Sequence, residues 1–153
     1  MVKKLSPSLE DYLEAILRLE KEYRVARVKD IAKALGVQMP SVTGALKSLR
    51  DKGLVNYQKN SFISLTETGK AAAEVINSRH YILDAFLKDI LGLEPAIASA
   101  EACGIEHIIS GDTAERIKNL GEYIKAVVFK KVSPQEWEAI LVKQDSGDDK
   151  EVE

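Results

Sequence analysis

Three separate segments of the chain carry side chains that can bind a divalent metal ion. The run Cys-Gly-Ile-Glu-His at 103–107 places its cysteine, glutamate and histidine at i, i+3 and i+4. A helix here would present all three on one face. Thiolate, carboxylate and imidazole groups are ordinary ligands of first-row transition metals. The full set, which includes both histidines and the single cysteine of the protein, is Asp11, Glu14, His80, Cys103, Glu106 and His107.

Taken one at a time, these residues have simpler explanations. A lone cysteine is more often a small buried hydrophobe than a ligand. A lone histidine is more often part of a core or a surface, and acidic residues near an N-terminus are most often solvated. The metal site is therefore a hypothesis about the whole set rather than about any single member.

Length, composition and charge limit the class of protein. At 153 residues with 45% apolar content, the chain can bury the core of one or two small domains. We expect a cytoplasmic protein without a membrane partner, because the sequence has no apolar run of about 18 residues and no signal-peptide core. Its one cysteine cannot form an internal disulfide.

The charge is divided unevenly along the chain. Residues 1–70 carry 13 Lys/Arg and 8 Asp/Glu, whereas the remainder carries 9 basic and 16 acidic residues. A basic first half suits a polyanionic partner, and an acidic second half suits cations or simply solubility.

The first half has the order of elements of a winged helix-turn-helix. An amphipathic helix is predicted over 8–24 with Ser8 as its N-cap. A short helix follows over 28–35, and a third runs from about Pro40 to Gly53. Two strands are predicted over 54–58 and 62–65. Helix, turn, helix and hairpin in this order predict a DNA-binding module.

Residues of this module are candidates for contact with DNA. Polar side chains at the start of the third helix could reach base edges, while basic ones pair with phosphates and position the protein. The alternative is a small helical domain with an ordinary solvated basic face. The candidate residues are Lys29, Gln38, Pro40, Ser41, Thr43, Lys47, Arg50, Lys59 and Asn60.

The second half is predicted to be all helical. Thr66 caps a helix that reaches about Leu91, and its apolar stripe is long enough to need a partner, most simply a second subunit. Further helices are predicted over 95–109 and 113–127, the latter with an Asp112/Glu115 capping box, and from Ser133. Residues 143–153 are polar and acidic, which predicts disorder. The fold class is thus mainly α, divided into 1–68, 69–142 and a tail over 143–153.

The motifs together resemble a known family. The run Glu-Asp-Tyr-Leu-Glu at 10–14, the winged helix, Arg79-His80 and Cys-Gly-Ile-Glu-His at 103–107 are similar to the diphtheria toxin repressor family over about residues 5–127. Within it, the manganese transport regulators are most similar. The resemblance implies a homodimer that binds double-stranded operator DNA when Mn(II) or Fe(II) is bound, and that represses metal-uptake genes. The third, SH3-like domain of longer iron-responsive members is expected to be absent.

The resemblance also implies which residues hold the metal, and here the pattern is mixed. The six residues listed above match ligand positions, and Glu14 and Glu106 are candidates to bridge two ions. However, manganese regulators carry glutamate in place of Cys103, whereas iron-responsive members carry cysteine there and methionine in place of Asp11. Carboxylates favour Mn(II) and thiolate favours Fe(II), with Zn(II) or Co(II) also able to bind in vitro. Gly44 replaces a glutamine with which some members read DNA, so no operator sequence is implied.

A switch mechanism follows from where these ligands fall. Asp11, Glu14 and Glu106 would repel one another when no metal is bound, at a cost of roughly 1–4 kcal/mol per pair at about 4 Å. A divalent ion would turn this repulsion into a clamp between the first helix and the helix over 95–109.

Other functions remain as alternatives. The first is a metal-independent winged-helix regulator that responds to another ligand, and another is a DNA-binding scaffold with an acidic dimerisation module. A metalloenzyme is the third, but no nucleophile–base pair or phosphate-binding loop is present, so we expect no enzyme.

Overall fold

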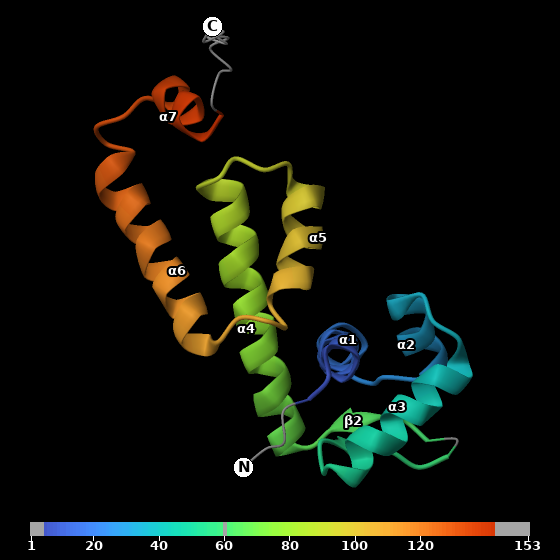
Figure 1. Ribbon diagram of the computed structural model, residues 1–153. Helices are drawn as coiled ribbons and strands as arrows, with labels where there is room; N and C mark the ends of the chain where they lie inside the picture. The colour runs from blue at the N-terminus through green and yellow to red at the C-terminus, as the bar shows by residue number, and fades with distance from the viewer. Residues whose placement is uncertain (1–4, 60, 143–153) are drawn as a thin grey trace, which may run out of the picture.

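The computed structural model describes residues 5–59 and 61–142, and Figure 1 shows two groups of helices joined by one long helix. The predicted Asn60 contact and the predicted disordered tail at 143–153 lie outside the described residues. The mainly α fold class is confirmed. The elements are α1 (Pro7–Tyr23), α2 (Val28–Leu35), α3 (Met39–Asp51), β1 (Val55–Asn56), β2 (Ser64–Leu65), α4 (Glu67–Asp89), α5 (Pro95–Ile105), α6 (Gly111–Tyr123), a π-helical turn η1 (Ile124–Val128) and α7 (Pro134–Leu141).

The first three helices and the two strands form the predicted winged helix. The N-cap of α1 is Ser6, whose side chain accepts a hydrogen bond from Leu9 N, and not Ser8 as predicted. The reason is that Pro7 occupies the first helical position, where its missing N–H costs nothing. Gly36, with a φ of 65°, ends α2 in the left-handed conformation that glycine adopts without strain.

The wing is shorter than the predicted strands. The antiparallel pairs are Val55 with Leu65 and Asn56 with Ser64, and an isolated bridge joins Ala26 to Ile63. The core beneath the wing is apolar and almost fully shielded from water. Its largest fully buried side chains are those of Leu13, Ile16, Ile31, Leu46, Leu49, Leu54 and Ile63.

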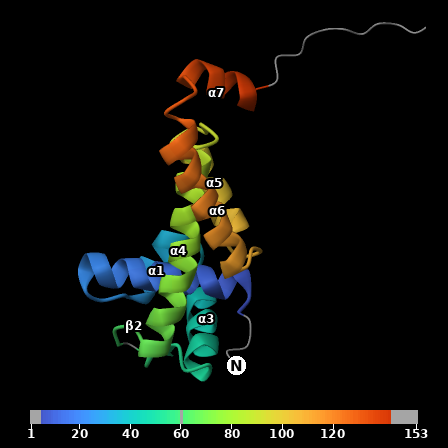
Figure 2. The same ribbon diagram turned by 90° about the vertical axis from the view of Figure 1, so that its left-hand side faces the viewer.

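Helix α4 connects the two halves of the molecule. Thr66 caps it as predicted, and its first half buries Ala73 and Ile76 in the winged-helix core. Its second half packs on α5 through a separate apolar cluster of Leu83, Leu87, Ala98 and Ala102. Helix α1 crosses α4, as Figures 1 and 2 show, and the two helices are packed together. An α1 side chain can therefore meet side chains of the second half.

One glycine is required where α4 meets the wing. A Cβ on Gly69 would lie 1.8 Å from the carbonyl oxygen of Leu54, so no other residue fits without moving the backbone. This close approach fixes the start of α4 against Leu54, the residue that precedes β1.

The helices of the second half differ from prediction at their ends. Helix α5 stops at Ile105 rather than near 109, and Ile108 is exposed in the following turn. Helix α6 begins at Gly111 with Ser110 as N-cap, so the predicted Asp112/Glu115 capping box is wrong. The Ser110 hydroxyl accepts the hydrogen bond from Thr113 N instead. None of the described helices is both long and apolar enough to cross a lipid bilayer.

Candidate metal centre and DNA-binding face

Four of the six predicted ligands lie together between α1 and the end of α5. Ligand atoms of Asp11, Cys103, Glu106 and His107 are all within 4.8 Å of one another. Cys103 lies in the last turns of α5, while Glu106 and His107 follow its last residue, Ile105. Although α5 ends earlier than predicted, Glu106 keeps helical backbone angles, and the three residues still converge.

The other two predicted ligands join this group through Glu106. Nδ1 of His80, on α4, lies 2.7 Å from Oε2 of Glu106. Glu14, one turn beyond Asp11 on α1, is close enough to Glu106 for the two carboxyl groups to perturb each other's pKa. The structure thus brings all six predicted residues to one cluster, with Glu106 at its centre.

Glu106 is an unusual residue for its position. It is fully buried, with 0% of its surface exposed, and Oε1 has no hydrogen-bond partner among residues 5–59 and 61–142. Nε2 of His107 lies 3.5 Å from this Oε1 atom, whereas Nδ1 of His80 contacts the other carboxylate oxygen, Oε2. A buried carboxylate oxygen is costly unless it is paired, and a bound cation is one way to pair it. The donor set therefore fits a divalent metal ion.

The burial of the cluster changes how its acids hold protons. Burial, and then interaction with the Glu106 carboxyl, raises the pKa of Glu14 to about 7. Burial raises the pKa of Glu106 as well. Burial also raises the pKa of the Cys103 thiol, and the negative charges of Glu106, Asp11 and Glu14 raise it further. These groups hold their protons to a higher pH than in water, so binding a cation here would release protons.

The two histidines of the cluster lie beside its acids. Nδ1 of His107 lies 2.7 Å from Oε2 of Glu10, and its Nε2 lies 2.9 Å from Oδ1 of Asp11. Burial alone would lower the pKa of His107, but the hydrogen bond to Glu10 and the nearby acidic charges outweigh it and raise the pKa. His107 thus contacts two carboxylates of α1 and joins that helix to the second half, whereas His80 contacts Glu106 within the second half.

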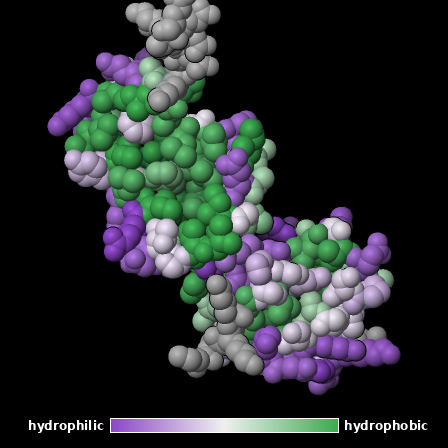
Figure 3. Space-filling view, viewed as in Figure 1, coloured by the Kyte–Doolittle hydropathy of each residue, from purple (hydrophilic) through white to green (hydrophobic). Residues whose placement is uncertain are grey.

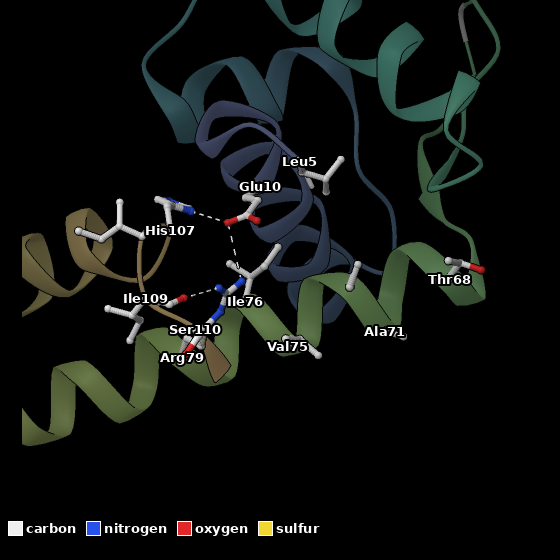
Figure 4. A pocket seen from close by; sticks show the side chains of 12 residues that line it. Leu5, Glu10, Thr68, Ala71, Val75, Ile76, Arg79, His107, Ile109 and Ser110 are labelled. Atoms are coloured by element: carbon white, nitrogen blue, oxygen red, sulfur yellow. Dashed lines mark hydrogen bonds and ion pairs between the residues drawn. The ribbon is translucent and has the colours of Figure 1, made fainter. Parts of the chain in front are cut away.

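Two residues of this network carried no predicted role. Figure 4 shows that Glu10 points toward His107 and that Arg79 reaches both Glu10 and the carbonyl oxygen of Ile109. One signal was available: a ligating histidine usually donates its second N–H to a carboxylate or a carbonyl, and Glu10 is adjacent to a predicted ligand. Helical spacing does not reveal this partner, because adjacent residues point in different directions.

The predicted DNA-contacting residues lie on and around α3. Most of their side chains are exposed and Thr43 is half-buried, with its hydroxyl donating to the carbonyl of Met39. Arg50 is already paired with Asp51 at 2.9 Å, so a phosphate would compete with that carboxylate. The guanidinium of Arg27, at the start of α2, lies 5.2 Å from the centre of the Phe62 ring in the wing, a contact that the sequence did not predict. The described candidates are Lys29, Gln38, Pro40, Ser41, Thr43, Lys47, Arg50 and Lys59.

An apolar surface covers the opposite half of the molecule. Figure 3 shows hydrophobic side chains gathered over the α4, α5 and α6 half, while the outer edge of the winged helix is hydrophilic. A groove of about 270 Å³ between α4 and α6 has an apolar lining from Ile82, Ala85, Phe86, Ile90 and Ile117, and charged residues, Lys118, Glu122 and Lys125, line it as well. Leu120 and Tyr123 of α6 are exposed. A contiguous apolar surface of this kind is typical of a protein–protein interface.

Comparisons with known proteins agree with both halves. The N-terminal DNA-binding domain of the iron dependent repressors matches residues 4–62, and their metal-binding and dimerisation domain matches residues 66–131. An uncharacterized HTH-type transcriptional regulator of Methanocaldococcus jannaschii is 38% identical over 122 residues, which cover 79% of this chain and 98% of that protein.

Solved structures show the same architecture. The manganese regulator SloR is 28% identical with a TM-score of 0.68, over 78% of this chain and 55% of its own. The regulator IdeR of T. acidophilum is 25% identical with a TM-score of 0.66, over 72% of this chain and 52% of its own. This chain thus spans about half the length of these two solved chains. On its fold, its cluster of potential ligands and these matches, the chain belongs to the iron-dependent repressor family of metal-dependent transcriptional regulators, the family of the diphtheria toxin repressor.

Proposed function

We propose that the protein is a homodimeric transcriptional repressor that binds operator DNA when a divalent metal, Mn(II) or Fe(II), occupies the cluster around Glu106. The observation that carries this proposal is the buried Oε1 of Glu106, which has no hydrogen-bond partner among the described residues and lies between ligand atoms of both halves. Metal-uptake genes are the proposed targets, which the family resemblance supports.

Six side chains would hold the metal. When bound, a divalent ion supplies the positive charge that lets several buried carboxylates be ionised together. Asp11 and Glu14 contribute from α1, His80 from α4, and Cys103, Glu106 and His107 from α5 and the turn after it. The set thus joins a helix of the DNA-binding half to two elements of the other half.

The chemistry of these ligands supports Mn(II) first and Fe(II) second. Three carboxylates are hard oxygen ligands, which suit Mn(II), whereas the Cys103 thiolate pulls toward softer or more tightly bound ions. The raised pKa of the Cys103 thiol works against the thiolate form unless a metal displaces the proton.

The packing of α1 suggests how the cluster would influence DNA binding. Helix α1 contacts α2 and α3 as well as α4, so residues that fix α1 on α4 also fix the orientation of α3. In a homodimer joined through the apolar α4–α6 surface, the two α3 helices would need a separation of about one turn of DNA, roughly 34–36 Å. Ligands that span α1, α4 and α5 would favour one such arrangement.

The proposal is tested by selecting duplexes from a random DNA pool with the protein and Mn(II), and then measuring affinity for the selected duplex. We expect Mn(II) to increase affinity about 5- to 150-fold over a chelator, the range of typical allosteric coupling. Lys47→Ala should weaken binding and lower its salt dependence while leaving Mn(II) binding unchanged, because a phosphate contact releases counterions. If the same duplexes are selected equally well with Mn(II) and with chelator, the result would favour a regulator that responds to another ligand.

A further inference from the structure

The imidazole of His107 is held at both of its nitrogen atoms by residues that are adjacent in the sequence. Nδ1 contacts Oε2 of Glu10 at 2.7 Å, and Nε2 contacts Oδ1 of Asp11 at 2.9 Å. The two nitrogens lie on opposite edges of the ring, which is why neighbours that point in different directions on α1 can each reach one. Only Nε2 faces Glu106, whose Oε1 lies 3.5 Å away.

We propose that Glu10 is a positioning residue of the metal centre, which accepts the Nδ1–H of His107 and thereby directs Nε2 toward the metal. This inference rests on the proposed function, because it takes His107 to be a ligand. Glu10 itself lies beyond the Nδ1 edge of the ring, away from the four converging ligand atoms. Its role is to fix the tautomer and orientation of the ring, as carboxylates commonly do behind metal-binding histidines.

Arg79 of α4 holds Glu10 in place. Its Nη2 lies 3.8 Å from Oε2 of Glu10, and its Nη1 donates a hydrogen bond of 3.1 Å to the carbonyl oxygen of Ile109. Ile109 is two residues beyond His107 in the same turn, so one guanidinium anchors both the turn and the carboxylate that orients its histidine (Figure 4). The side chains of Glu10, Arg79 and His107 are 12%, 16% and 8% exposed, which keeps water from replacing these bonds.

The location of Glu10 links the orientation of His107 to the position of the DNA-binding half. Glu10 belongs to α1, the first helix of the DNA-binding half, whereas His107 and Arg79 belong to the other half. The orientation of a ligand therefore depends on where α1 sits. Displacing α1 would misdirect His107 as well as remove Asp11.

The test compares Glu10→Gln and Glu10→Ala with the wild-type chain by Mn(II) titration and by histidine NMR of the chelated protein. Glu22→Ala, at the exposed far end of the same helix, is the matched control. We expect Glu10→Ala to weaken Mn(II) binding about 10- to 100-fold, the usual effect of losing such a partner. Glu10→Gln should lose less Mn(II) affinity, because its amide oxygen still accepts the Nδ1–H. Glu22→Ala should bind Mn(II) as tightly as the wild type.

The NMR spectrum separates orientation from general destabilisation. In the wild type and in Glu10→Gln, His107 should show a protected Nδ1 proton, which Glu10→Ala should lose while the His80 signals stay unchanged. Mn(II) affinity of Glu10→Ala equal to that of the wild type would overturn the inference. An equal loss in Glu10→Gln and Glu10→Ala would also overturn it, because the retained acceptor would then be without effect. If the wild-type chain binds no Mn(II), the proposed function fails first, and the inference fails with it.

Discussion

Nδ1 of His80 lies 2.7 Å from Oε2 of Glu106, so a histidine of α4 partners the buried carboxylate at the centre of the cluster. Together with the His107 contacts to Glu10 and Asp11, this pair places a histidine beside three of the acids. The proposed metal would therefore exchange one set of pairings for another, and the histidines would change from hydrogen-bond partners into ligands.

The His80–Glu106 pair predicts that His80→Ala uncouples metal from DNA without unfolding the protein. The variant removes a proposed ligand and leaves Oε2 of Glu106 without this partner, so Mn(II) should no longer raise DNA affinity. Glu74→Ala, an exposed substitution on the same helix, is the control and should respond like the wild type. The measurements are fluorescence anisotropy on the selected duplex and circular dichroism for the fold. A His80→Ala protein that still responds fully to Mn(II) would remove this residue from the site.

The raised pKa of Glu14 predicts that metal binding strengthens with pH. Glu14 titrates near 7 in the folded protein and near 4.5 when unperturbed, and a cation requires its ionised form. Below pH 7, Mn(II) must displace the proton, at about tenfold in affinity per pH unit for one proton. The increase in melting temperature caused by Mn(II) should therefore be larger at pH 8 than at pH 6.

In the protein without metal, the raised pKa of Glu14 predicts that stability falls as the pH rises. Because the unfolded chain releases the Glu14 proton near pH 4.5 and the folded chain releases it near 7, the chelated protein should lose stability as pH rises through this interval. Thermal unfolding from pH 4.5 to 8, with and without Mn(II), measures both trends. Glu14→Gln is the control, in which stability and its increase by Mn(II) should both depend less on pH. A stabilisation by Mn(II) that is the same at pH 6 and pH 8 would contradict this assignment.

If Cys103 is a ligand, a substitution at this position should change which metal ion binds most tightly. Replacing its sulfur by a carboxylate in Cys103→Glu should move the ranking away from Zn(II) and Co(II) and toward Mn(II), because a hard oxygen ligand replaces a soft one. Cys103→Ser is the control that removes the thiol without adding charge. Competition titrations give the ranking, and loss of sulfur-to-Co(II) charge-transfer absorption reports the ligand directly. An unchanged ranking in both variants would show that the cysteine is not a ligand.

Gly69 and Gly44 make a matched pair for stability. In Gly69→Ala the new Cβ meets the Leu54 carbonyl oxygen at 1.8 Å, so we expect the free energy of unfolding to fall by about 1–3 kcal/mol or more. In Gly44→Ala nothing lies within 4 Å, and a helical alanine should raise it by roughly 0.5–1 kcal/mol. Urea denaturation measures both. Equal effects in the two variants would mean that α4 does not approach the wing this closely.

The local parts of the fold were predictable because they depend on residues close in sequence. The Thr66 cap of α4 and the Gly36 end of α2 follow from side-chain and backbone preferences that act within one turn. The errors are also local, since Ser110 and not Asp112 is the N-cap of α6. Helix α5 was predicted to reach 109, but the turn at Glu106 ends the helix and leaves Ile108 exposed.

The candidate site could be predicted only in part, because it depends on distant contacts. Helical spacing linked Cys103 with Glu106. The prediction that Asp11 also joins them came from the family resemblance, because no periodicity spans so many residues. Glu10 was missed because the two edges of an imidazole can recruit adjacent residues, which helical spacing treats as separate faces. The predicted repulsion is present between Glu14 and Glu106, whose charge raises the pKa of Glu14, but the prediction counted the acids without their histidine partners.

The central claim is that metal and DNA binding are coupled through α1, and a reciprocal titration tests it most directly. The affinity for the selected duplex is measured with Mn(II) and with chelator, and the affinity for Mn(II) is measured with and without the duplex. Linkage requires the same factor in both directions, and we expect about 5- to 150-fold. Duplex affinities that are equal with and without Mn(II), in a protein that binds the ion, would contradict the account.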